Sequence, residues 1–402
     1  MSFQIQIDHG AAWVVEQLEA AGYEAYVVGG CVRDALMGIT PKDWDITTSA
    51  RPEQVKAVFP VTFDTGIEHG TVSVRYEHET YEVTTYRIDG AYTDHRRPTE
   101  VAFTSKLYED LARRDFTINA MAYHPQRGLI DYFEGQRDLK EGCIRCVGKA
   151  EERFEEDALR MLRAIRFAAR LQFTIESKTF SAIQIKAEGL AHVSRERVAD
   201  EMNKTLLCEN PQGLRQIVSS GLYPYICGQF AGESPEYIDF EAPAKVLCQK
   251  ALRWAALLYP LGSEKAGKVL RELKFDNITH RDTVHLVQFR EAALPQTGRD
   301  MRFFLNQLGI GYFEALCSLK EATKQDSKQK LMSGWTIFEA EKEQCVTLHQ
   351  LAVSGRDLIG AGAQTGKELG QALNLLLELV MEQPEMNEKD RLLQYFCENL
   401  QA

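Results

Sequence analysis

Asp43 and Asp45 have the residue type and spacing that metal-dependent phosphate chemistry needs. They are separated by Trp44 and followed by the β-branched segment that begins at Ile46. In a β-strand, residues i and i+2 point to the same face. We therefore expect two carboxylates side by side, with Trp44 and Ile46 pointing into a core. Carboxylates this close favour a hard cation such as Mg²⁺, and two such ions support in-line attack on a phosphate.

An apolar stretch and two glycines precede these aspartates. Residues 25–28 predict a short buried strand, which Gly29-Gly30 ends. Residues 32–37 favour a short helix that Gly38 terminates. Backbone N–H groups at a glycine turn before a helix suit a bound phosphate. The order of these elements therefore predicts a phosphate site beside a metal site.

The combined unit resembles the signature of the DNA polymerase β-like nucleotidyltransferase superfamily. This resemblance implies transfer of a nucleotidyl group from a nucleoside triphosphate to a hydroxyl. Alone, an Asp-x-Asp pair is most often a solvated strand end, and Gly-Gly is usually a turn.

Glu82 lies on the second strand of a hairpin predicted at residues 71–76 and 80–87. It is either a third metal ligand or an ion-paired strand residue.

A second polar group lies in a helix predicted through residues 156–167. Its arginines recur every three or four residues and therefore lie on one side of the helix, while the apolar residues between them face a core. These arginines are Arg160, Arg163, Arg166 and Arg170. One interpretation is a solvated basic face. The other is a phosphate site, because guanidinium groups bind phosphate bidentately.

Asp157 and Arg160 are one helical turn apart, so a carboxylate acceptor and a guanidinium donor can lie in one plane. Cytosine and adenine each present a donor beside an acceptor, and guanine and uracil present the reverse order. One Asp–Arg pair can therefore accept C and A and reject G and U, at roughly 10⁴-fold discrimination. The spacing alone does not assign this role.

Three motifs in this order resemble those of the class II tRNA nucleotidyltransferases. These CCA-adding enzymes build the 3′ CCA end of tRNA without a nucleic-acid template. The motifs are Gly29-Gly30 with Asp43-x-Asp45, Arg113-Arg114-Asp115, and Glu156-Asp157-x-x-Arg160. The surrounding residues are similar to the enzymes of Bacillus-type bacteria over residues 20–205, and the similarity fades toward the C-terminus.

The resemblance implies a role for each matching residue. Asp43 and Asp45 would hold Mg²⁺ and be catalytic, and the incoming ATP or CTP would be bound by Gly30, Arg33, Arg114, Asp115, Asp157, Arg160, Arg163 and Arg166. Within that set, Asp157 and Arg160 would read the base. Residues 192–197 resemble the motif that braces the neck of these enzymes. Trp44 is bulkier than the apolar residue that usually separates the aspartates.

The implied fold class is α+β, with a polymerase β-like nucleotidyltransferase head followed by an all-α neck, body and tail. We expect the head at residues 1–150, the neck at 151–210, the body at 211–325 and the tail at 326–402. No convincing strand is predicted after Glu151. The helical body and tail would bind tRNA.

Composition limits the alternatives. The chain has 402 residues, 44% hydrophobic and 26% charged, with a formal net charge of −11. This charge argues against a non-specific nucleic-acid binder, so RNA would need a local basic surface. The lack of a membrane span, of an N-terminal signal segment and of a disulfide framework among nine cysteines favours the cytoplasm. We expect tRNA, ATP and CTP as partners, and neither a membrane nor DNA.

Rival functions share parts of this pattern. Bacterial poly(A) polymerases share the head and neck motifs but usually carry a basic tail, whereas this sequence ends in Glu398-Asn399-Leu400-Gln401-Ala402. CC-adding relatives lack the polar loop expected here at residues 89–98. An enzyme that adds only A is harder to separate. A non-catalytic RNA-binding protein is disfavoured because both aspartates are present.

Overall fold

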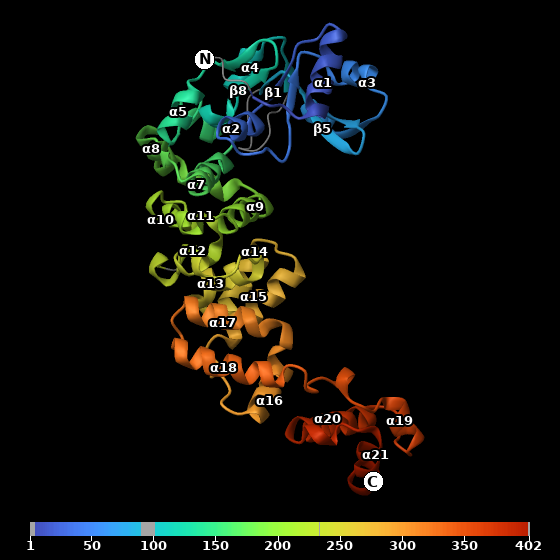
Figure 1. Cartoon of the computed structure of the whole chain (residues 1–402). Helices are drawn as coiled ribbons and strands as arrows, with labels where there is room; N and C mark the ends of the chain where they lie inside the picture. Colours follow the sequence, from blue (N-terminus) through green and yellow to red (C-terminus); the bar gives the residue numbers. More distant parts are fainter. Residues whose placement is uncertain (1–4, 90–100, 233, 401–402) are drawn as a thin grey trace. The chain divides into compact units, whose positions relative to one another are not determined.

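The structure, a computed structural model, describes residues 5–89, 101–232 and 234–400. The chain forms two compact units, Met1–Glu236 with Val269–Phe275, and Tyr237–Lys268 with Asp276–Ala402 (Figure 1). The predicted polar loop lies outside the described residues from residue 90 onward. Among the described helices, none is long and apolar enough to cross a bilayer.

A mixed seven-stranded sheet forms the centre of the first unit, in the order β3-β4-β5-β2-β1-β8-β9. Only β2 and β5 pair in parallel, and the other neighbours are antiparallel. The strands are β1 (Ala25–Val28), β2 (Ile46–Thr48), β3 (Thr62–Gly66), β4 (Thr71–Tyr76), β5 (Glu79–Thr85), β8 (Met121–His124) and β9 (Gly128–Asp131). A separate pair, β6 (Arg87–Asp89) and β7 (Val101–Phe103), flanks the undescribed segment. The hairpin predicted from β-branched residues is therefore confirmed as β4 and β5.

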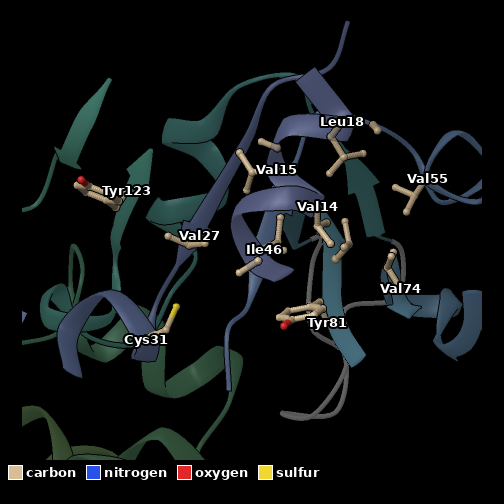
Figure 2. Packing of buried hydrophobic residues seen from close by; sticks show 14 of the residues in the cluster. Val14, Val15, Leu18, Val27, Cys31, Ile46, Val55, Val74, Tyr81 and Tyr123 are labelled. Carbon is tan, nitrogen blue, oxygen red and sulfur yellow. The ribbon is translucent and has the colours of Figure 1, made fainter. Parts of the chain in front are cut away.

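The main hydrophobic core lies on one face of this sheet. Figure 2 shows Val14, Val15 and Leu18 of α1 (His9–Ala20) directed toward Val27 and Ile46 of the sheet. Val27, Ile46 and Val83 are cross-strand neighbours on β1, β2 and β5, so they form one continuous apolar surface. Helices α2 (Gly30–Leu36) and α3 (Pro52–Val58) contribute further residues to this core. Because side chains alternate along β2, Thr47 faces the opposite side of the sheet.

The opposite face carries a smaller core beneath α4 (Leu107–Ala112). Leu107 and Leu111 of α4 pack against Tyr26 and Val28 of β1, and Tyr86 is fully buried with them. Residues 107–112 therefore form a helix whose apolar side is buried against the sheet. This packing places Arg113 and Arg114, which directly follow α4, near β1, the strand that ends at the glycine turn.

The rest of the first unit is mainly helical. Its helices are α5 (Gly135–Glu141), α6 (Ala150–Glu156), α7 (Leu159–Leu171), α8 (Ser177–Lys186), α9 (Arg195–Leu206), α10 (Gln216–Ser219), α11 (Tyr223–Ile226) and α12 (Gly228–Ala231). The expectation of no strand after Glu151 is wrong. The short strand β11 (Thr174–Ile175) pairs in parallel with β10 (Cys143–Ile144). Two residues of strand give too short a pattern for periodicity to detect.

The second unit contains α13 (Lys250–Leu258), α15 (Asn277–Phe289), α16 (Gly298–Leu308), α17 (Phe313–Ala322), α18 (Lys328–Glu341), α19 (Gly355–Gly360), α20 (Lys367–Glu382) and α21 (Lys389–Asn399). Helix α14 (Gly262–Glu272) contributes residues to both units. In the second unit the last three helices enclose a core that includes Leu358, Leu376 and Phe396. The two units do not correspond one to one with the four predicted domains, so those boundaries stay predictions.

Two glycine-to-alanine substitutions test the packing of the helices. A Cβ at Gly10 in α1 would overlap the Tyr81 ring, which is held by the hydrogen bond from its hydroxyl to Asp8. Gly10→Ala should therefore lower the free energy of unfolding by about 1–3 kcal/mol. Gly370 in α20 has no atom within 4 Å of a Cβ, so Gly370→Ala should raise it by about 0.5–1 kcal/mol. Urea unfolding measures both, and equal effects of the two substitutions would contradict the described packing.

Candidate active site

The glycine turn and the aspartates are neighbours because β1 and β2 pair antiparallel. Gly29 has φ +83°, a conformation that favours glycine, and α2 begins at Gly30. The Val28 N–H donates to the Asp45 carbonyl oxygen at 2.9 Å, so Asp45 lies beside the end of β1. A Cβ at Gly29 would lie 2.8 Å from Nη1 of Arg114. The turn therefore leaves room for a guanidinium group directly over its backbone.

Asp43 and Asp45 precede β2, which begins at Ile46, so the predicted strand starts later than expected. Ile46 is buried in the main core and Trp44 packs against it, as predicted. Both aspartates are exposed. Ile46 pairs with Val83, so one residue back along these parallel strands Asp45 lies opposite Glu82. Asp43, Asp45 and Glu82 are consequently near enough for their negative charges to repel one another.

The pKa directions reflect this concentration of negative charge. The surrounding protein displaces water from the Asp45 carboxylate, and this desolvation raises its pKa. The positive charge of Arg114 opposes the rise, and the negative charge of Asp43 adds to it. Desolvation, then repulsion by Asp45 and Asp43, likewise raises the pKa of Glu82. An all-oxygen donor set of this kind fits a hard divalent cation. Among the described residues, no three His, Cys, Asp or Glu residues are grouped to hold an ion, so water and substrate oxygens would complete its coordination.

A buried carboxylate, Asp110 of α4, holds the two arginines at the end of that helix. Arg113 donates to its Oδ1 from Nε at 3.0 Å and from Nη2 at 2.8 Å, and Arg114 donates to Oδ2 at 3.5 Å. The Thr47 hydroxyl lies 3.1 Å from the same Oδ2. Burial opposes ionisation, but Arg113 and Arg114 outweigh it and lower the pKa of Asp110. Arg114 is thereby fixed near both the glycine turn and Asp45.

Asp115 joins this segment to α7. Arg163 donates to its Oδ2 from Nε at 2.8 Å and Nη2 at 2.6 Å, while Asn119 donates to Oδ1 at 3.1 Å. Burial would raise the pKa of Asp115, but the Arg163 charge and these hydrogen bonds prevail and lower it to about 2. Arg163 also lies 3.7 Å from Glu201 of α9. Arg163 is therefore paired within the protein and is one-third exposed.

Asp157 and Arg160 are not on one continuous helix, which corrects the sequence prediction. Asp157 has φ −146° and ψ 102° and caps the end of α6, and α7 begins at Leu159. Arg197 donates to Asp157 Oδ2 at 2.7 Å, and the Leu159 N–H donates to Oδ1 at 3.1 Å. Arg160 donates to Glu156 at 2.6 Å and to the Arg113 carbonyl at 2.9 Å. The predicted base-reading pair is close in sequence, but each member has other partners here.

The basic side of α7 is not a solvated surface, so that interpretation is wrong for most of it. Arg160 and Arg166 are each 8% exposed. Arg166 donates to Glu201 at 2.6 Å and stacks over Phe167. Only Arg170, 3.4 Å from Asp34, is largely exposed. Arg160 pairs locally with Glu156, four residues before it, and also donates to the distant Arg113 carbonyl, whereas Arg166 pairs with Glu201, 35 residues away. The contacts with distant segments have no local sequence signal.

Arg33 belongs to the same buried group. Its guanidinium donates to Asp34 at 2.8 Å and to Asn119 at 2.6 Å, and it lies over Phe167. It is 3% exposed. A direct contact with a triphosphate, as predicted for Arg33, would require it to leave these partners.

Sequence reasoning missed three residues that hold the site. Asp110 lies three and four residues before Arg113 and Arg114, a helical ion-pair spacing that could have identified it. Glu201 and Asn119 contact arginines 35 and 86 residues away in the chain. No local pattern could have found those two.

Comparison with known proteins decides the family. The Poly A polymerase head domain matches residues 25–145, the probable RNA- and SrmB-binding site of polymerase A matches 172–231, and the putative tRNA nucleotidyltransferase domain 2 matches 247–396. The CCA-adding enzyme of Lacticaseibacillus paracasei is 40% identical over 390 residues, covering 94% of each chain. The chain belongs to the family of CCA-adding enzymes. The predicted family, enzyme class and α+β fold class are confirmed.

Solved CCA-adding enzymes share this fold. The Bacillus stearothermophilus enzyme, crystallised with CTP, is 34% identical with a TM-score of 0.81 over 96% of each chain. The Thermotoga maritima CCA-adding enzyme complexed with tRNA is 23% identical with a TM-score of 0.68, covering 98% of this chain and 96% of that one. The second likeness concerns the fold alone. Nucleotidyltransferases of this family generally use divalent metal ions.

The Asp115–Arg163 pair predicts a pH dependence of stability. The pKa of Asp115 is lowered from 3.8 to about 2 on folding, so its contribution is complete above about pH 4 and is lost as the pH falls toward 2. Over that range the wild type should lose about 2 kcal/mol that Asp115→Asn does not lose. Urea unfolding at pH 2–5 measures the difference. Parallel pH profiles for the two proteins would contradict the pairing.

Proposed function

We propose that this chain adds C, C and A in order to the 3′ end of tRNA, using CTP and ATP. In each step the terminal 3′ hydroxyl of the tRNA loses its proton and its oxygen bonds to the α-phosphorus. The bond to the β-phosphate bridging oxygen breaks and pyrophosphate leaves. The observation that carries the proposal is that the glycine turn, the two aspartates, Arg114 and the base-reading motif lie in one unit. The C, C and A specificity follows from the family.

Asp43 and Asp45 would hold the divalent ions, which we propose to be Mg²⁺. When bound, such ions make the hydroxyl more acidic and stabilise charge on the phosphate and the leaving pyrophosphate. The protein's own contribution is to hold the two carboxylates at the end of β1 beside the turn. Glu82, opposite Asp45 on the neighbouring strand, would be either a third ligand or a strand residue beside the site.

Asp157 and Arg160 would read the base. A carboxylate acceptor and a guanidinium donor match the donor N4–H₂ and acceptor N3 of cytosine, and the N6–H₂ and N1 of adenine. In the structure Arg197 donates to Asp157, and Arg160 donates to Glu156. Base binding would therefore exchange protein partners for the base edge. This exchange limits the affinity for any base that cannot replace both sets of hydrogen bonds.

The phosphates would be bound by the remaining predicted residues. Gly30 begins α2 at the turn, the Nη1 of Arg114 lies close to Gly29, and α7 carries Arg163 and Arg166. Arg33 would support this group through Asn119. Ribose and phosphate contacts of Asp115 would compete with its pairing to Arg163, so we expect Asp115 to act mainly by holding that arginine.

The helical regions would bind tRNA. We propose the neck at residues 151–210, the body at 211–325 and the tail at 326–402, with the tRNA top half on body and tail. A cytoplasmic location and the absence of membrane and DNA partners stay predictions from the sequence.

One assay tests the function. Purified protein receives tRNA transcripts that end before CCA, after C or after CC, with CTP and ATP alone or together, and the 3′ ends are sequenced. The expected products are C and CC with CTP alone, and a single terminal A only after CC. Unlimited A would indicate a poly(A) polymerase, A on the CC transcript alone an A-adding enzyme, and no addition a non-catalytic RNA-binding protein.

Substitution of the aspartates tests the metal site. Asp43→Ala or Asp45→Ala should lower kcat about a thousand-fold, because the ions supply several kcal/mol of charge stabilisation. Affinity for tRNA, measured by filter binding, should not change. Asp64→Ala removes an exposed carboxylate paired with Lys56 and serves as the matched control. A comparable loss of kcat in Glu82→Ala would identify Glu82 as a third metal ligand. Near-normal turnover in Asp43→Ala or Asp45→Ala would remove that aspartate from the mechanism.

Substitution of the base-reading pair tests specificity. Asp157→Ala and Arg160→Ala should reduce incorporation of C and A and relax rejection of U and G, because each removes one half of the donor–acceptor match. The ratio of kcat/KM for CTP to that for UTP should fall at least about ten-fold. Arg170→Ala is the control, since Arg170 is exposed on the same helix. Slower addition with unchanged base selectivity would assign the pair to structure alone.

A further inference from the structure

Arg114 has an unusual environment for an arginine at a phosphate site. Among the residues that the structure describes, Asp110 is the only one that accepts a hydrogen bond from its guanidinium, at 3.5 Å. Its Nε is buried without a partner, and its Nη1 lies over Gly29. Arg114 therefore keeps donors directed at the glycine turn while a single carboxylate restrains it.

That carboxylate has no exposure to solvent and connects three elements. Oδ1 accepts from both Arg113 nitrogens and lies 3.4 Å from the Arg87 backbone nitrogen in β6. Oδ2 lies between the Thr47 hydroxyl of β2, at 3.1 Å, and Arg114. Thr47 is two residues after Asp45 and faces the same side of the sheet. Asp110 thus fixes the spacing between the strand that follows Asp45 and the guanidinium over the turn.

We propose that Asp110 is a positioning residue for the incoming nucleotide, acting by holding the Arg114 guanidinium over the Gly29-Gly30 backbone. This proposal rests on the proposed function. The alternative is that Asp110 only stabilises the fold by neutralising Arg113. The two differ in a measurable way, because positioning acts through Arg114 and stabilisation does not.

Asp110→Asn is the informative substitution. An asparagine keeps the shape and one acceptor for Arg113 but turns an amide N–H₂ toward Arg114 or Thr47. Loss of the charge-assisted hydrogen bond should weaken CTP binding in the presence of Mg²⁺ about ten-fold, with KM for CTP and ATP rising alike and kcat within about three-fold of wild type. In an Arg114→Ala background the same substitution should have no further effect.

Asp138→Asn is the matched control. Asp138 is equally buried and accepts from an arginine, Arg145 at 3.0 Å, and from a threonine, Thr117 at 2.6 Å, but it contacts none of the predicted nucleotide-binding residues. The Asp138→Asn variant should have a lower free energy of unfolding but an unchanged affinity for CTP. Circular dichroism and urea unfolding record the stability of every variant.

Calorimetric titration with CTP and Mg²⁺ gives the affinities, and single-nucleotide addition gives KM and kcat. Unchanged CTP affinity in Asp110→Asn, an equal loss in Asp138→Asn, or a full further loss in the Arg114→Ala background would overturn the proposal. Asp110→Glu, which keeps the charge but displaces the carboxylate, provides a second variant. If neither variant folds, Asp110 serves the fold and the proposal also fails. Absence of C addition by the wild type would instead refute the proposed function.

Discussion

The ion pair between Asp115 and Arg163 is the interaction on which the candidate site depends. It joins the segment after α4 to α7, two elements that are 48 residues apart in the sequence. Because Asp115 is buried, removing Arg163 would leave the Asp115 charge without its ion-pair partner, at a cost of about 3–5 kcal/mol. The orientation of α7 toward the sheet is therefore set by directional hydrogen bonds as well as by apolar packing. The position of any base or phosphate contact made by a residue of α7 therefore depends on this orientation.

A second consequence concerns how an acidic protein handles a highly charged substrate. The arginines of α7 are paired with the protein's own carboxylates, namely Glu156, Asp115 and Glu201. This pairing restrains the guanidinium groups, so under the proposed function less side-chain entropy would be lost on binding. Under the same proposal, a nucleotide would have to compete with Glu156 for Arg160. Arg114, by contrast, has donors without partners among the described residues, which suits it to meet the phosphates first.

The sequence was informative where chemistry and local structure coincide. The glycine turn, the short α2 and the hairpin of β4 and β5 could be predicted because each depends on neighbouring residues. The break at Asp157 could not, because the apolar pattern of α6 continues into α7 while Arg197, 40 residues away, holds Asp157 outside the helix. The burial of Arg166 was missed for the same reason, since its partner Glu201 lies 35 residues away, and that of Arg160 depends in part on the distant Arg113 carbonyl. The sequence thus allowed candidate site residues to be proposed, but not the partners with which they are paired in the structure.

The structure of the protein bound to CTP would test most directly whether the pair at the start of α7 reads the base. We predict that Asp157 accepts a hydrogen bond from cytosine N4 and that Arg160 leaves Glu156 to donate to N3. The Asp115–Arg163 pair should stay within hydrogen-bonding distance. A complex in which Arg160 remains on Glu156 and Asp157 on Arg197, with cytosine bound by other residues, would contradict this mechanism of base selection.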